Sequence, residues 1–251
     1  LSSSSAASDV YKRQIQGWHI NMRRDKLKDR RVREALILAF DFEWTNATLM
    51  FNSYKRTTSF FENTPLKAVG RPSPEELVLL EPFRKDLPAE VFDEPYIPPV
   101  SDGSGQDRNN LRRAGQLLQE AGMKRDGNVL KLPSGQAFTI EFLDFDPSLQ
   151  PHAGGLVKNL KLLGIDATMR TVDAAQYQKR TDEFDFDITM RNMGGTLTPG
   201  DGLRNVYGSE AAKRAGGRNL AGIMEPAVDA LIEVIGRAKS REELNLSLIH
   251  I

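Results

Sequence analysis

Apolar residues recur along the chain at two spacings, and these spacings separate predicted strands from predicted helices. Between Gly17 and Arg23, apolar Trp18, Ile20 and Met22 alternate with polar residues, and this period of two predicts a strand. Similar apolar segments predict further strands over residues 128–132, 137–143, 165–172 and 184–190. Apolar residues three or four apart predict helices over residues 30–51, 74–84, 107–121, 149–163, 173–181 and 226–238.

The order of these elements predicts the fold class. From residue 137 to residue 190 the chain runs strand, helix, strand, helix, strand, which is typical of an α/β sheet with right-handed crossovers. The periodicity is weaker over residues 57–106, where eight prolines collect between Pro65 and Pro99. We interpret this segment as a long Pro-rich excursion from the sheet, of the kind that is often functional.

The two ends of the sequence differ from the rest. Residues 1–14 read LSSSSAASDVYKRQ and residues 245–251 read NLSLIHI, and neither continues the neighbouring apolar pattern. We interpret both as non-native flanks that pack against nothing. We therefore expect residues 15–244 to be an interior part of a longer protein.

Composition excludes several classes of protein. The 251 residues are 39% hydrophobic and 27% charged, which is enough apolar surface to bury a core. The formal net charge of zero does not fit a general nucleic-acid coat, so we expect no nucleic-acid partner. With no cysteine, the chain has no disulfide, thiol nucleophile or thiolate metal site. The longest apolar runs are also too short to cross a bilayer.

The usual patterns of catalytic and metal-binding residues are missing. The three histidines are far apart in sequence, and neither a zinc-binding motif nor a phosphate loop is present, so we predict no metal site, no cofactor and no catalytic residue. Residues 102–107 resemble a calcium loop but lack its sixth-position glycine and twelfth-position glutamate. The acidic doublets at Asp144/Asp146 and Asp185/Asp187 are interpreted as carboxylates pointing outward at strand ends, with the neighbouring phenylalanines inward.

A glycine-rich loop over residues 191–202 is the most suggestive candidate for a site. It follows the predicted strand 184–190, and ligands of open α/β sheets bind beyond the carboxyl ends of strands. An ordinary glycine-rich connection would explain the spacing equally well. The predicted ligand-binding residues are the first six of the loop, Arg191, Asn192, Met193, Gly194, Gly195 and Thr196.

Several segments carry a resemblance to a known family. Residues 21–44, which contain DRRVREALILAFD, resemble the F-N-x-x-x-P-F-D-D-x-R-V-R-x-A-L-x-x-A-x-D segment of the family 5 extracellular solute-binding proteins. Five further segments, at 54–63, 72–82, 159–166, 171–177 and 218–230, are similar to its YejA-like branch. The resemblance spans about residues 16–244 and consists of several motifs in the same order.

The resemblance implies a periplasmic-binding-protein-like fold of type II, with a ligand enclosed between two lobes. The chain would be most of the second lobe, a truncated mixed sheet flanked by helices. It would belong to a non-enzymatic subunit of an ABC importer, monomeric and periplasmic in a Gram-negative bacterium. Its partners would be an oligopeptide or modified-peptide ligand and the transmembrane subunits of the permease.

One departure from the family pattern bears on the ligand. Free-peptide binders of the family often follow the strand equivalent to 184–190 with Gly-Trp and then an aspartate. Here the loop has no tryptophan, and no acid precedes Asp201. A blocked or modified peptide therefore fits better than a free amino end, and Arg191 could meet a carboxylate or phosphate. Two other functions stay open, a peptide-directed hydrolase and a non-catalytic interaction module that uses the Pro-rich excursion.

Overall fold

In the computed structural model the chain folds as two compact units, each built from separate stretches of sequence. The structure describes residues 14–62, 64, 66–194, 200 and 202–248. Unit 1 takes its residues from 1–17, 57–97 and 191–251, and unit 2 comprises 18–56 and 98–190. The chain therefore passes from one unit to the other after Gly17, Arg56, Ile97 and Met190.

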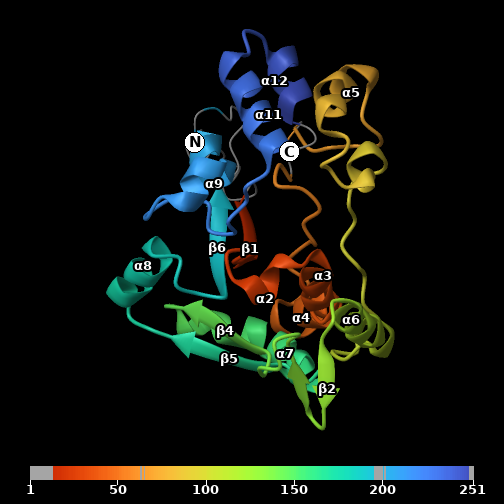
Figure 1. Ribbon diagram of the computed structural model, residues 1–251, viewed down its shortest axis with the longest axis vertical. Coiled ribbons are helices and arrows are strands. Elements are labelled where there is room, and N and C mark those ends of the chain that lie inside the picture. The colour runs from red at the N-terminus through yellow and green to blue at the C-terminus, as the bar shows by residue number, and fades with distance from the viewer. Residues whose placement is uncertain (1–13, 63, 65, 195–199, 201, 249–251) are drawn as a thin grey trace. The chain divides into compact units, whose positions relative to one another are not determined.

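A four-stranded sheet has the order β1-β6-β4-β5 (Figure 1), and β1 and β6 each have residues in both units. Its strands are β1 (Gln14–Ile20), β4 (Thr139–Asp144), β5 (Asp166–Thr171) and β6 (Ile188–Gly194). β4 pairs in parallel with β5 and with β6, with Leu143 opposite Arg170 and Thr189. The predicted α/β class is confirmed, because helices α7 (Gln150–Leu162) and α8 (Ala174–Asp182) provide the crossovers.

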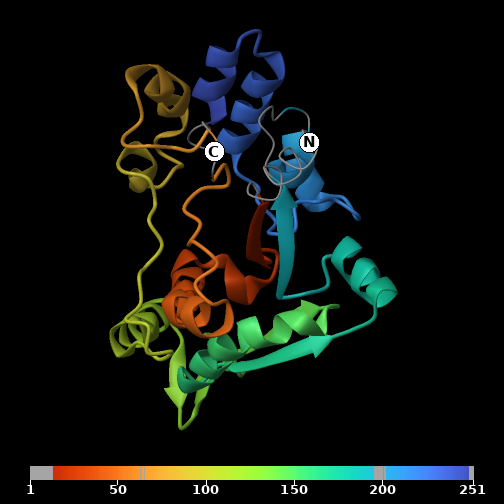
Figure 2. The ribbon, with the colours of Figure 1, turned by 180° about the vertical axis from the view of Figure 1, so that it is seen from behind.

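The core of unit 2 lies between this sheet and a group of helices. These are α2 (Asp25–Lys28), α3 (Arg30–Leu38), α4 (Phe42–Leu49), α6 (Arg108–Glu120) and α7. Val32 and Leu36 of α3, Leu117 of α6 and Leu160 of α7 pack in one buried cluster with Ile140 of β4. Seen from behind, α7 lies along β5 (Figure 2). Apolar residues three or four apart on these helices therefore cover one face of the sheet.

The predicted helix over residues 30–51 is two helices. Asp29 caps α3 as expected, its side chain accepting a hydrogen bond from the Arg31 amide at 2.8 Å. The helix ends at Leu38, and Asp41 caps α4 by accepting from the Trp44 amide at 2.8 Å. Phe51, predicted to be buried, is 84% exposed, because the chain turns there with positive φ at residues 51 and 52.

The sequence also predicts that the strands over residues 128–132 and 137–143 form a hairpin, and the structure forms only its turn end. β3 (Val129–Lys131) pairs antiparallel with β2 (Lys124–Asp126), which the sequence analysis did not predict. The expected partner segment joins β3 by an isolated bridge between Lys131 and Ala137 and then enters the parallel sheet as β4. Short loop length alone favoured the hairpin, whereas burial of β4 between two other strands determines its pairing.

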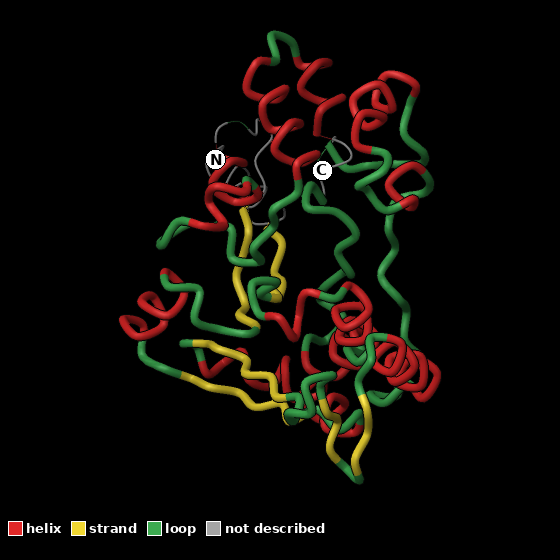
Figure 3. Tube along the Cα trace, viewed as in Figure 1, coloured by secondary structure: helices red, strands yellow, loops and turns green. Residues whose placement is uncertain are grey.

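The described part of unit 1 is mostly helical (Figure 3). It contains α5 (Pro74–Leu80), the 3₁₀ turns η1 (Glu81–Phe83) and η2 (Ala89–Phe92), α9 (Gly202–Tyr207), α10 (Ser209–Lys213), α11 (Pro226–Arg237) and α12 (Arg241–Leu248). Phe61 and Leu66 of the Pro-rich excursion pack with Leu203, Ile232 and Leu244 in a second buried cluster. Helix α12 continues past Asn245 to Leu248, although the sequence pattern was expected to break there.

Candidate functional site

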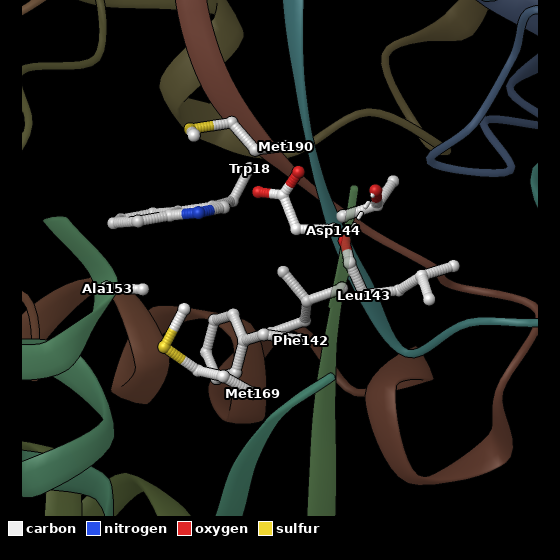
Figure 4. Close-up of a pocket in the computed structure, with 9 residues that line it drawn as sticks. Trp18, Phe142, Leu143, Asp144, Ala153, Met169 and Met190 are labelled. Carbon is white, nitrogen blue, oxygen red and sulfur yellow. Dashed lines mark hydrogen bonds between the residues drawn. The ribbon is translucent and has the colours of Figure 1, made fainter. Parts of the chain in front are cut away.

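A small pocket within unit 2 lies beside the carboxyl end of β4 and the first residues of β6 (Figure 4). It holds about 10 Å³, roughly the room of one water molecule. Its lining residues come from β1, β4, β5, β6 and α7, namely Trp18, Phe142, Leu143, Asp144, Ala153, Met169, Ile188, Thr189 and Met190. Trp18 and Met169 are only partly buried, so the pocket opens toward the surface on their side.

The strand order brings β4 and β6 side by side at the pocket. From β4 the chain crosses by α7 to β5 on one side, and from β5 it returns by α8 to β6 on the other side of β4. The two connections thus run in opposite directions along the sheet. Phe142–Asp144 of β4 and Ile188–Met190 of β6 border the pocket together.

Aromatic side chains fix one wall of the pocket. The Trp18 ring meets the Phe40 ring edge-on at 4.9 Å between centroids and the Phe142 ring at 6.3 Å. Figure 4 shows the indole on one side of the pocket and Phe142 and Met169 on the opposite side. The indole is therefore held by packing before any ligand arrives.

The side chain of Thr189 forms hydrogen bonds within the protein. Its hydroxyl lies 3.0 Å from the Leu143 carbonyl oxygen, to which it donates, and 2.9 Å from the Tyr177 hydroxyl. Tyr177 in turn donates to the Met190 carbonyl at 3.2 Å. This network ties α8 to β6 and uses the polar atoms of the Thr189 side chain.

Asp144 ends β4 inside the pocket and is 7% exposed. Its Oδ1 accepts hydrogen bonds from the amides of Phe145 at 2.7 Å and Asp146 at 3.1 Å. Asp146 instead caps the next turn, and hydrogen bonds from Ser148 hold the pKa of the Asp146 carboxyl below its usual value. The expectation that both carboxylates point outward is thus wrong for Asp144, because its oxygen folds back onto the amides that follow the strand.

The two carboxylates of the second acidic doublet, Asp185 and Asp187, also have different surroundings. β6 begins at Ile188 rather than Phe184, and Phe184 has a positive φ of 54°. Asp187 is 8% exposed and pairs with Lys26 at 2.8 Å, while its Oδ2 accepts from the Glu141 amide at 2.9 Å. Asp185 lies at the surface and pairs with Arg24 at 2.8 Å and Arg180 at 3.0 Å. These carboxylates form ion pairs and hydrogen bonds just before β6 begins, and neither of them lines the pocket.

The residues predicted from sequence to bind ligand follow the pocket strand directly. Arg191–Gly194 complete β6, with Arg191 half-buried and Asn192 exposed. Gly195 and Thr196 lie outside the described residues, and the side-chain environment of Met193 is likewise not described. Sequence analysis did not single out the pocket residues Trp18, Met169 and Met190, which read as ordinary core positions.

Two other kinds of feature are absent from the described part of the chain. It contains no group of three or more His, Cys, Asp or Glu side chains that could hold a metal ion. None of its helices combines the length and the apolar character needed to span a membrane.

Comparison with known proteins identifies the family. The family model described as bacterial extracellular solute-binding proteins, family 5 Middle, matches residues 6–214. The chain belongs to this family. Among curated relatives, a probable peptide-binding protein YejA of Agrobacterium fabrum is 41% identical over 91% of the chain, and an uncharacterized protein YejA of Escherichia coli is 39% identical over 91%. The chain spans 38% of the length of each of these two relatives.

Solved structures of the family share the fold. NikZ from Campylobacter jejuni, in complex with Ni(L-His), matches with a TM-score of 0.69 and 18% identity, over 95% of this chain and 42% of that one. The oligopeptide-binding protein AppA from Bacillus subtilis, in complex with a nonapeptide, matches with a TM-score of 0.64 and 16% identity, over 98% of this chain and 45% of that one. At this level of identity the likeness concerns the fold alone.

Proposed function

We propose that this chain is part of the substrate-capturing subunit of an ABC importer for peptides or modified peptides. The observation that carries the proposal is the 41% identity, over nearly the whole chain, to a probable peptide-binding protein. The pocket supports it, because it lies at the carboxyl end of β4, and ligands of α/β sheets bind near such strand ends. In this role the chain captures a solute in the periplasm, delivers it to permease subunits and catalyses no reaction.

The proposed organisation follows the family resemblance. Residues 15–244 form most of the second lobe of a two-lobed protein, with the Pro-rich excursion at 57–106 as part of it. The ligand is enclosed when this lobe closes toward the other, so the second lobe supplies one wall of the site. A site that encloses most of a ligand loses much of its contact area when one wall is removed. We therefore expect the isolated chain to bind peptides weakly.

Arg191 is the proposed ligand donor on this wall. It continues β6 directly after Met190, which lines the pocket. A guanidinium at the end of this strand suits a ligand carboxylate or phosphate, to which it can donate two hydrogen bonds.

Calorimetry on the full-length protein that contains this chain tests the proposal. We expect tight, one-to-one binding of an oligopeptide from a panel of free and N-blocked peptides, and blocked peptides should bind at least as well as free ones. Absence of binding across the panel would contradict peptide capture. Incubation of the same protein with a panel of fluorogenic peptides tests the hydrolase alternative. Turnover of a peptide would show that the protein is a hydrolase and contradict the proposal.

Substitution of Arg191 by alanine tests the site. We expect Arg191→Ala to weaken peptide binding by about 1.5–3 kcal/mol, the loss expected for a charge-assisted hydrogen bond. The free energy of unfolding should change by less than about 0.5 kcal/mol. Arg218→Ala, at an exposed position of unit 1, is the matched control and should change neither quantity. Lower stability of Arg191→Ala with unchanged affinity would assign Arg191 to an internal ion pair instead.

A further inference from the structure

Phe145 is an exposed aromatic residue at the carboxyl end of a buried strand. β4 ends at Asp144, whose carbonyl accepts a hydrogen bond from the Val172 amide at 2.9 Å, and Phe145 is the next residue. Phe145 is 48% exposed, whereas Phe142 within β4 is 4% exposed. Its ring therefore reaches solvent at the edge of the parallel sheet beyond which α/β proteins bind their ligands.

Local hydrogen bonds hold the backbone around Phe145. The Phe145 amide donates to Asp144 Oδ1 at 2.7 Å, and the Asp146 amide donates to the same oxygen at 3.1 Å. Asp146 in turn accepts from the Ser148 amide at 2.9 Å and so caps the turn that follows. Aspartate side chains that bond the amides after them fix the chain in a turn. The direction in which Phe145 leaves the strand is thus set by its neighbours.

The ring of Phe145 rests on a second ring. It packs against the Tyr177 ring with 4.8 Å between centroids and 48° between the planes. Tyr177 is 3% exposed, and its hydroxyl lies 2.9 Å from the Thr189 hydroxyl and donates to the Met190 carbonyl at 3.2 Å. A side chain that is ordered before binding loses little rotamer freedom when a ligand arrives. Phe145 is therefore a preorganised aromatic contact.

The other strongly exposed phenylalanine of unit 2 has no such support. Phe51 is 84% exposed and makes no ring contact within the described part of the chain. It follows helix α4, in a turn of positive φ, and not the carboxyl end of a strand. Exposure alone therefore does not distinguish Phe145, but its support by Tyr177 and its place at the end of β4 do.

We propose that Phe145 determines specificity in solute capture by contacting an aromatic side chain of the bound peptide. That side chain adds a third ring to the Phe145–Tyr177 pair, in an edge-to-face or offset arrangement. It also covers apolar surface of Phe145 that is exposed without ligand, and this burial stabilises the complex. A charged peptide side chain gains neither contribution. The inference rests on the proposed function, since it assigns one side chain of the captured peptide to the end of β4.

Peptides that differ in one side chain test this contact on the full-length protein that contains the chain. The probes are N-acetylated pentapeptides of alanine in which a single phenylalanine occupies each position in turn, and calorimetry measures their affinities. We expect phenylalanine at one position to raise the affinity about tenfold over the all-alanine peptide. Leucine at that position should give a smaller gain and glutamate none. If no phenylalanine peptide binds more tightly than the all-alanine peptide, the proposal is overturned.

Variants of the two exposed phenylalanines assign the gain to a residue. Phe145→Ala should reduce the phenylalanine gain to within about twofold, with a smaller effect on the all-alanine peptide, since the coupling between two contacting groups disappears when either is removed. Phe145→Tyr keeps a ring and should retain most of the gain. Phe51→Ala is the matched control and should retain all of it. An unchanged gain in Phe145→Ala would overturn the proposal.

Cross-linking on the unaltered protein decides the matter if Phe145→Ala does not fold. A peptide with benzoylphenylalanine at the favoured position should label the tryptic peptide of residues 132–158, which contains Phe145. Labelling confined to other segments would overturn the contact. Failure here is distinguishable from failure of the proposed function. If no peptide of the panel binds, peptide capture itself is contradicted, whereas binding without a phenylalanine gain leaves capture intact and removes only the role of Phe145.

Discussion

Removal of the Asn21 side chain should destabilise unit 2 strongly. Asn21 is fully buried, and its Nδ2 donates to the carbonyls of Phe184 at 3.0 Å and Phe186 at 2.9 Å. Its Oδ1 accepts from the Arg23 amide at 3.2 Å and the Arg23 guanidinium at 3.0 Å. One side chain thus holds the end of β1 to the segment that leads into β6, across more than 160 residues of sequence.

The magnitude follows from these four hydrogen bonds. Each contributes about 0.5–1.5 kcal/mol net, and a buried group left unpaired costs more than the bond it loses. The Phe186 carbonyl keeps a second donor, since the Arg24 Nε lies 3.1 Å away. We therefore expect Asn21→Ala to lower the free energy of unfolding by about 2–4 kcal/mol. Asn21→Asp preserves the size but turns an oxygen toward two carbonyls, so it should be at least as destabilising.

Urea unfolding followed by tryptophan fluorescence measures this loss, because Trp18 and Trp44 both lie in unit 2. Asn109→Ala is the matched control, since Asn109 is exposed and its Oδ1 accepts only from Arg112. The control should stay within about 0.5 kcal/mol of the unaltered chain. If Asn21→Ala also stays within that range, the network around Asn21 does not hold β1 to β6 as argued.

Two further substitutions have calculable effects. Gly164 has φ of 86°, and an added Cβ would lie 2.9 Å from the Leu130 amide nitrogen. We therefore expect Gly164→Ala to lower the free energy of unfolding by about 2–4 kcal/mol, measured by urea unfolding. The control Gly127→Ala, whose Cβ would meet nothing within 4 Å, should lower it by about 1 kcal/mol. Equal losses would refute the steric reason. Burial raises the pKa of Tyr207 to about 12 by disfavouring the charged phenolate. The unfolded chain then loses this proton at lower pH than the folded one, so stability should fall between about pH 10 and 12, and Tyr207→Phe should remove that part of the fall. Ultraviolet absorbance of the phenolate measures the titration, and a Tyr207 step near pH 10 would contradict it.

The sequence predicted helices and their starts better than strand ends. Asp29, Asp107 and Asp173 all cap helices where a capping residue precedes an apolar period, because the cap is a local interaction. The break at Ala39 between α3 and α4 escaped prediction, since the apolar spacing continues through it. What stabilises the break is distant in sequence: Asp41 also bonds the Gly105 amide at 2.8 Å, and Asn159 donates to the Ala39 carbonyl at 2.9 Å.

The start of β6 was missed for a similar reason. Phe184 and Phe186 alternate with aspartates and so resemble the opening of a strand. In the structure these residues form the connection from α8, and their carbonyls bond to Asn21 rather than to a neighbouring strand. Alternation indicates which side chains are buried, here Phe186, but not which backbone groups pair.

Position within the sheet accounts for what the sequence could and could not reveal about the site. The rule that ligands bind at the carboxyl ends of parallel strands directed attention to the end of the strand predicted over residues 184–190, and the pocket does include Thr189 and Met190, although the strand continues to Gly194. The same rule applies to the end of β4, yet Asp144 was interpreted as a solvated acid because its doublet with Asp146 suggested two equivalent carboxylates. They differ because the backbone turns immediately after Asp144 and closes on its own Oδ1, which leaves that carboxylate among Trp18 and Phe142 and sends Asp146 to cap the next turn. Equal residue types two positions apart therefore acquire different surroundings: Asp146 caps the next turn, whereas Asp144 is 7% exposed and lines the pocket.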